Sequence, residues 1–165
     1  MPSDLATHLR RKYGLTKAPS DDEIDAIIHD SGLEIAEREM AGRLRELICR
    51  DILFVRADQS RYWKRWVKLH GLAHWLLHDG NQAYLDSHAL DGTVLSKQER
   101  QAEIFAGCMV LGGSLPDSWD NSLYSMAEDA EVPEVCLRRW WFHVLDGVGQ
   151  AQVWVAQLLI RGPDN

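Results

Sequence analysis

Two histidines four residues apart, His70 and His74, are the side chains of this sequence best suited to chemistry. At this spacing on a helix they lie one turn apart on the same face, so both imidazoles can converge on one zinc ion. The spacing is that of the zinc-binding motif H-E-x-x-H, whose glutamate acts as the general base of hydrolysis. Gly71 stands at the position of that glutamate. The sequence therefore keeps the histidine pair and lacks the base.

A third ligand should be a carboxylate from another helix, and Glu99 and Glu103, again four residues apart, are the candidates. Glu99 completes a capping-box pattern that begins at Ser96, which would turn its carboxylate towards its own backbone. Glu103 lies one turn further on, between Ala102 and Ala106, whose small side chains allow close approach of another helix. One carboxylate could bind zinc while the other orients a ligand histidine. Spacing alone does not assign these roles, and we prefer Glu103 as the direct ligand.

A third histidine, His78, follows at the next helical step of four residues. The helix between His70 and His78 would span about 12 Å at 1.5 Å per residue. Three residues spread over that length rarely all reach one tetrahedral ion. We therefore interpret His78 as a residue that packs beside the site or hydrogen-bonds to a ligand.

The elements that must position these residues follow from the periodicity of the apolar side chains. Helices are expected over residues 3–13, 20–32, 60–78, 96–111, 123–131 and 133–145. Alternation within residues 33–58, with a short apolar run at 51–56, predicts an antiparallel sheet of two or three strands. Residues 37–47 also contain many helix formers. A turn is expected at 79–81 and a polar loop after it, whereas the apolar segment 150–160 fits either a helix or a strand.

Length and composition favour an ordinary globular protein. The chain has 165 residues, of which 45% are hydrophobic and 26% charged, enough to bury a core within one domain. We predict a single domain over 1–165, with N-terminal helices in 1–32, the sheet and the metal-site helices in 33–111, and a helical part in 112–165. A net charge of −7 disfavours direct binding of nucleic acid or of anionic membranes.

The cysteines and the N-terminus bear on the cellular compartment. Cys49, Cys108 and Cys136 are far apart and include no C-x-x-C pair, which predicts reduced thiols in a cytoplasmic protein. The N-terminus has no apolar signal region, and no window approaches 18 apolar residues. We therefore expect neither export nor a membrane span.

The sequence over residues 65–78, R-W-V-K-L-H-G-L-A-H-W-L-L-H, followed by E-R-Q-A-E-I-F-A at 99–106, resembles the ImmA/IrrE family of metallopeptidases. The family pattern is R-x-x-x-A-H-E-L-G-H-x-L-L-H, then E-x-[EQ]-A-[ND]-x-F-A-A-x-L-L-M-P. A weaker likeness extends upstream to Phe54-Val55, Asp58 and Arg61, and downstream over residues 126–138. The two helices together are far more specific than either one alone.

The resemblance implies an α+β, zincin-like metallopeptidase domain, mostly helical, with a small antiparallel sheet before the zinc helix. It implies a cytoplasmic, zinc-dependent protease that cleaves helix-turn-helix repressors, often encoded beside its target in phages, mobile elements or stress regulons. His70 and His74 would be zinc ligands, together with a carboxylate from the helix of Glu99 and Glu103.

Three departures from the family pattern matter. Gly71 replaces the general base, Glu103 stands where Asn or Asp is usual, and residues 111–113, L-G-G, replace the Met-Pro that closes the helix. A positioned general base contributes about 10²–10⁴-fold to a rate. We therefore expect a catalytically impaired protein that binds, or acts weakly on, a co-encoded helix-turn-helix repressor.

Two alternatives remain open from the sequence. In the first, the protein is an active peptidase in which another carboxylate replaces the base, the nearby candidates being Glu99, Glu103, Asp79 and Asp86. In the second, residues 123–145 form the helix-turn-helix of a DNA-binding regulator, with positive charge from the arginines at 138 and 139. The aromatic residues at 140–142 are more typical of a core, and the chain is acidic.

Overall fold

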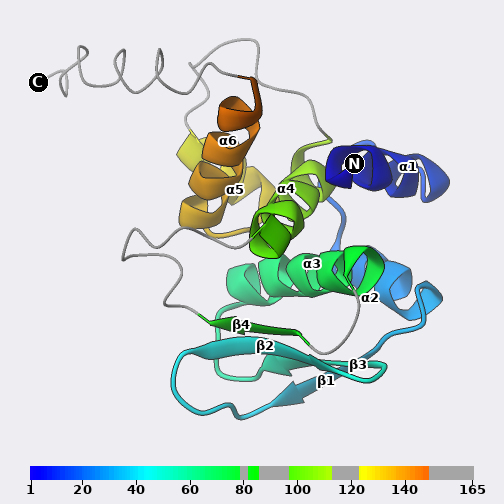
Figure 1. The fold of residues 1–165 in the computed structure, drawn as a ribbon, viewed down its shortest axis with the longest axis vertical. Coiled ribbons are helices and arrows are strands. Elements are labelled where there is room, and N and C mark those ends of the chain that lie inside the picture. Colours follow the sequence, from blue (N-terminus) through cyan, green and yellow to red (C-terminus); the bar gives the residue numbers. More distant parts are fainter. Residues whose placement is uncertain (79–81, 86–96, 113–122, 149–165) are drawn as a thin grey trace, which may run out of the picture.

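The helix that carries His70 and His74 lies between a small sheet and a second layer of helices (Figure 1). The computed structural model describes residues 1–78, 82–85, 97–112 and 123–148. Its helices are α1 (Pro2–Lys12), α2 (Asp21–Asp30), α3 (Arg61–Leu77), α4 (Lys97–Leu111), α5 (Leu123–Ala130) and α6 (Glu134–Val148). The sheet covers one side of α3, and α4 packs against the other side. The expected α+β class, rich in helix, is confirmed.

The helix ends follow local signals that the sequence makes visible. At α2 the Ser20 hydroxyl accepts a hydrogen bond from the Glu23 amide, and the Glu23 carboxylate accepts one from the Ser20 amide, so the capping box is formed. At α3 the Ser60 hydroxyl accepts from the amide of Trp63. The helix bounds therefore agree closely with the sequence prediction, although α6 continues past residue 145. The predicted turn at 79–81 and the segment 150–160 lie outside the described residues.

The sheet contains four strands, β1 (Glu34–Arg38), β2 (Leu44–Cys49), β3 (Ile52–Arg56) and β4 (Gln82–Leu85), in the order β1-β3-β2-β4. β2 pairs antiparallel with both β3 and β4, whereas β1 and β3 are parallel. The prediction of two or three strands before the zinc helix is confirmed, since β1, β2 and β3 precede α3 and β2 pairs antiparallel with β3. The sheet differs from it in two ways: β1 and β3 are parallel, and β4 adds a fourth strand after α3.

Both differences have a simple physical origin. The chain reverses between β1 and β2 and again between β2 and β3, so β3 runs in the direction of β1 and pairs with it in parallel. β4 comes after α3 and joins the other edge of β2. It is only four residues long and lies in a segment that reads as a polar loop, so its sequence carries little strand signal.

The core is formed where the sheet meets α3. Side chains alternate along a strand, so Ile48 of β2 and Leu53 and Val55 of β3 point to the same buried side. Trp66 and Leu69 of α3 are completely buried in the same core cluster. His70 and His74 lie on this helix and are themselves buried, so the sheet and α4 together remove them from bulk water.

The C-terminal helix α6 contributes side chains to the core. Trp140 and Trp141 of α6 are buried, as expected, but Phe142 is 41% exposed, so the expectation of a core position is wrong for that residue. Arg139 forms an ion pair with the buried carboxylate of Glu103 on α4. One of the two arginines that would serve a DNA-binding helix is therefore used inside the fold.

Gly107 on α4 is a position where we expect a single methyl group to destabilise the protein. A Cβ atom there would lie 2.1 Å from Cδ1 and 2.2 Å from Cγ of Trp140, a buried ring on α6. Gly107→Ala should therefore lower the free energy of unfolding by roughly 1–3 kcal/mol, even though alanine is a better helix former by about 1 kcal/mol. Denaturant-induced unfolding measures the change.

Gly71→Ala is the matched comparison, because its new methyl group would meet mainly the flexible end of Leu53. We expect Gly71→Ala to cost less stability than Gly107→Ala. A Gly107→Ala protein at least as stable as the natural one would contradict the close packing of α4 on α6.

None of the helices in the described part of the chain is both long and apolar enough to cross a membrane.

Candidate metal centre

α3 presents its two histidines as a buried pair. Ser60 caps the helix, and the apolar residues at 66, 67, 69, 72 and 73 fix which face turns inward. His70 is 0% exposed and His74 is 2% exposed, and their ring centroids are 4.8 Å apart. The sequence prediction that the two imidazoles share one helical face is confirmed.

Glu99 of α4 is the carboxylate that reaches both histidines. Its Oε2 lies 3.4 Å from Nε2 of His70, and its Oε1 lies 3.3 Å from Nε2 of His74. Burial opposes ionisation of Glu99, but the hydrogen bonds and charges of the two histidines outweigh it and hold the pKa of this carboxyl well below its usual range. Glu99 is therefore a carboxylate that bridges the two rings.

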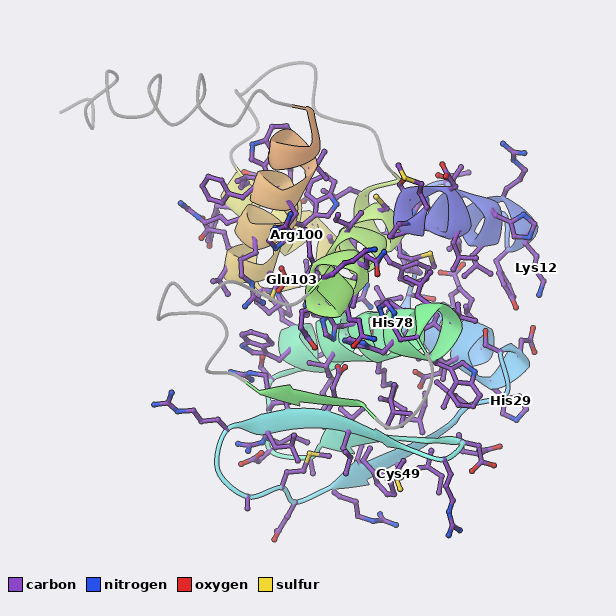
Figure 2. All side chains as sticks on the ribbon, viewed as in Figure 1. Lys12, His29, Cys49, His78, Arg100 and Glu103 are labelled. Atoms are coloured by element: carbon purple, nitrogen blue, oxygen red, sulfur yellow. The ribbon has the colours of Figure 1, made fainter. Side chains whose placement is uncertain are left out.

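Glu103, the preferred ligand from the sequence, points elsewhere. It is 0% exposed and lies between α4 and α6 (Figure 2), where Oε1 is 3.0 Å from Nε of Arg139 and Oε2 is 2.8 Å from Nε2 of His143. The preference for Glu103 over Glu99 therefore does not match the geometry. The competing capping role of Glu99 depended on Ser96, which lies outside the described residues, and the Glu99 carboxylate turns to α3.

Glu46, a residue that the sequence interpretation missed, lies on the other side of His70. It comes from β2, is 2% exposed, and accepts a hydrogen bond from Nδ1 of His70 at 2.9 Å. Burial raises the pKa of the Glu46 carboxyl above its ordinary value, although the charge of His70 opposes the shift. Burial likewise disfavours the His70 imidazolium, but Glu46 and Glu99 outweigh it and raise the pKa of His70 to about 10. The ring of His70 therefore lies between two carboxylates.

One signal in the sequence could have pointed to Glu46. In β2 the inward positions alternate, and Glu46 and Ile48 both occupy them. A carboxylate at an inward position of a strand next to a core helix needs a partner, because burying an unpaired charge is costly. Its partner, His70, is 24 residues further along the chain, so only the tertiary fold brings the two together.

The position of the missing base, Gly71, is surrounded by other side chains. A Cβ atom at Gly71 would lie 2.6 Å and 3.2 Å from the two terminal methyl groups of Leu53, and 3.4 Å from Oε1 of Glu46. The absence of a side chain at Gly71 thus leaves room for another side chain near the histidines, that of Glu46. That side chain belongs to the protein itself and comes from the sheet.

His78 lies just beyond the last residue of α3, at the end of the histidine stripe (Figure 2). Its ring centroid is 5.2 Å from that of His74, and its Nε2 lies 3.3 Å from the carbonyl oxygen of Gln98. Burial and the neighbouring His74 lower the pKa of His78. His78 therefore lies beside the histidine pair and contacts the start of α4. The sequence interpretation places it in the same way, as a residue that packs beside the site.

The donor atoms of this centre fit a zinc ion. Zinc is bound by histidine nitrogen and carboxylate oxygen at about 2.0–2.2 Å, and tetrahedral geometry then places neighbouring donors roughly 3.3–3.5 Å apart. The distances from Glu99 to Nε2 of His70 and of His74, 3.4 and 3.3 Å, have that size. A second grouping shares the histidines, because donor atoms of Glu46, His70 and His74 all lie within 4.8 Å of one another. In that grouping Nδ1 of His70 is already engaged by Glu46.

A model of one protein family matches the chain over residues 29–135, and its description is the IrrE N-terminal-like domain, a peptidase family. The matched segment runs from the end of α2 to the start of α6, and so contains the sheet, both histidines and α4. No curated protein and no solved structure matches the chain.

Proposed function

Because this chain belongs to the family of the IrrE N-terminal-like domain, whose members are zinc-dependent metallopeptidases, we propose that it is a zinc-binding member with impaired peptidase activity. Its role would be to bind a helix-turn-helix repressor encoded beside it, as the resemblance to ImmA/IrrE proteins suggests. The observation that carries the proposal is the buried centre in which Glu99 faces both His70 and His74 next to a glycine at the base position.

Three residues of the chain would hold the metal. His70 and His74 would each offer Nε2, and Glu99 would offer a carboxylate oxygen. Zinc bound there would act as a Lewis acid that polarises a carbonyl group. Burial of the histidines between the sheet and α4 would limit water around them and strengthen their electrostatic interaction with Glu99.

The surroundings of Gly71 are the reason why we expect the peptidase activity to be impaired. The side chain that would accept a proton is absent, and the described carboxylates near the centre have other partners. Glu99 faces the two imidazoles, Glu46 accepts from Nδ1 of His70, and Glu103 is paired with α6. The two further candidates from the sequence, Asp79 and Asp86, lie outside the described residues.

The proposal is tested with purified full-length protein and the helix-turn-helix repressor encoded in the neighbouring gene. We expect about one zinc per chain by elemental analysis, since one centre is built, and binding of the repressor in a pull-down or titration. We expect no cleavage of the repressor by gel or mass spectrometry. Cleavage that a chelator abolishes would contradict impairment, and protein without zinc or repressor binding would contradict the proposed role.

Gly71→Glu sharpens this test. In a site that had merely lost its base, restoring glutamate would restore cleavage by about 10²–10⁴-fold. Here the new side chain would meet Leu53 and would place a second carboxylate beside Glu46 in a buried space. We therefore expect no gain of cleavage by Gly71→Glu alone.

A further inference from the structure

We propose that Glu46 is a positioning residue for His70, and that its carboxylate lies in the space into which a long side chain at position 71 would extend. This assignment rests on the zinc centre proposed above and extends it to the sheet. It links the loss of the base to the sheet, because the position that departs from the family motif lies beside the carboxylate that contacts the first histidine.

The hydrogen bond from His70 to Glu46 would fix the tautomer and the orientation of the His70 ring. A histidine that binds metal through one ring nitrogen usually donates its other N–H to a carboxylate or carbonyl, which sets the tautomer and the ring orientation. Here Nδ1 lies 2.9 Å from the Glu46 carboxylate, and Nε2 is the nitrogen that faces Glu99. With Nδ1 holding the proton for Glu46, a metal ion on the side of Glu99 and His74 would take the place of the proton on Nε2.

Position 71 lies next to that hydrogen bond. Oε1 of Glu46, the atom that accepts from His70, lies 3.4 Å from the place of a Cβ atom at position 71. A glutamate at 71 would extend from that Cβ into the volume that Leu53 and Glu46 now fill. Two carboxylates would then share one buried site, and like charges in a dry site repel strongly. Glu46 and the glutamate of an intact motif are therefore competing occupants of the same region.

Glu46 is not placed to take over the role of the base. The two nitrogens of an imidazole point in different directions, so a carboxylate bonded to Nδ1 lies behind the ring as seen from Nε2. A general base must come within about 2.6–3.2 Å of the proton it removes, directly or through one water. Glu46 thus supports a ligand and leaves the reacting side of the centre without a base, in agreement with the impairment proposed above.

Zinc affinity of Glu46 variants tests the assignment. It is measured in full-length protein by competition with a chromophoric chelator, together with the cobalt spectrum and an NMR correlation of the histidine ring nitrogens in zinc-loaded protein. Removing a hydrogen-bonding partner of a ligand histidine typically costs 10–100-fold in metal affinity. We expect a loss of about 10–100-fold for Glu46→Leu, with one zinc per chain retained, and a smaller loss for Glu46→Gln, whose amide oxygen still accepts from Nδ1.

The spectra distinguish a positioning role of Glu46 at His70 from a general effect of the substitution on folding. Glu46→Leu should shift the Nδ1–H signal of His70 and alter the cobalt spectrum, while Glu46→Gln restores both towards the natural protein. Glu34→Gln, at an exposed position of β1, serves as the control and should change neither the affinity nor the spectra. Circular dichroism of each variant without metal verifies that it is folded.

Several results would overturn the assignment. Unchanged zinc affinity in folded Glu46→Leu would show that Glu46 does not support His70. Loss of zinc from Glu46→Leu together with its retention by Glu99→Leu would make Glu46 a direct ligand. If the natural protein takes up no zinc, the proposed function itself is wrong. This outcome is distinguishable, because the zinc content of the natural protein is measured before any variant is compared.

The competition between positions 46 and 71 has a test that needs no metal. We expect Gly71→Glu to lower the melting temperature of the zinc-free protein, and the same substitution to lower it less in a Glu46→Leu background, because the second carboxylate is then absent. Non-additivity of this kind is the signature of two residues that share a site. Equal effects of Gly71→Glu in the two backgrounds would overturn the claim that they compete.

Discussion

Glu99→Gln should lower the zinc affinity of the protein by about 100-fold or more, whereas Glu103→Gln should leave it close to that of the natural protein. A partner that only orients a ligand histidine contributes about 10–100-fold, so loss of a direct ligand should equal or exceed that range. Glu99 contacts Nε2 of both histidines, and Glu103 is turned to Arg139 and His143. Chelator competition on the two folded variants measures the difference.

The two substitutions form a matched pair, since each removes one negative charge from α4 without changing the size of the side chain. A global effect of the charge on the protein would act on both variants alike. Comparable losses in the two would contradict the assignment of Glu99, and a larger loss for Glu103→Gln would restore the preference that the sequence alone suggested.

The carboxylate roles illustrate where reasoning from sequence ends. Helical periodicity is local, so it correctly places His70 beside His74. It puts Glu99 and Glu103 one turn apart but does not tell which element each carboxylate meets. The packing of α4 against other helices determines which neighbour each carboxylate contacts, and this neighbour changes within one helical turn. At Glu99 the neighbour is α3, and one turn later it is α6.

The features of the fold also fall into those that local sequence determines and those that depend on distant contacts. Caps such as Ser20 and Ser60 are set by their own neighbouring residues, and the helices therefore begin where the sequence predicts. The parallel pairing of β1 with β3 and the addition of β4 depend on contacts between distant segments. Glu46 belongs to this second kind, because strand register and the helix above the sheet together bring it to His70.

The buried ion pair between α4 and α6 should make Arg139 one of the most costly residues to remove. Glu103 is completely buried, and Nε of Arg139 lies 3.0 Å from its Oε1. Breaking a buried pair by removing one partner typically costs 3–5 kcal/mol, because it leaves an uncompensated charge. We expect Arg139→Met to lower the free energy of unfolding by about 3–5 kcal/mol, towards the lower end because His143 still contacts the carboxylate at 2.8 Å.

A double variant distinguishes the lost charge from lost packing. In Glu103→Met with Arg139→Met no charge of the pair stays buried, and replacing a buried pair with apolar side chains is often neutral or stabilising. Urea unfolding should therefore find the double variant more stable than Arg139→Met alone. If the double variant is the less stable of the two, the pair contributes through its fit between the helices, and the electrostatic account of how α6 is held to α4 is wrong.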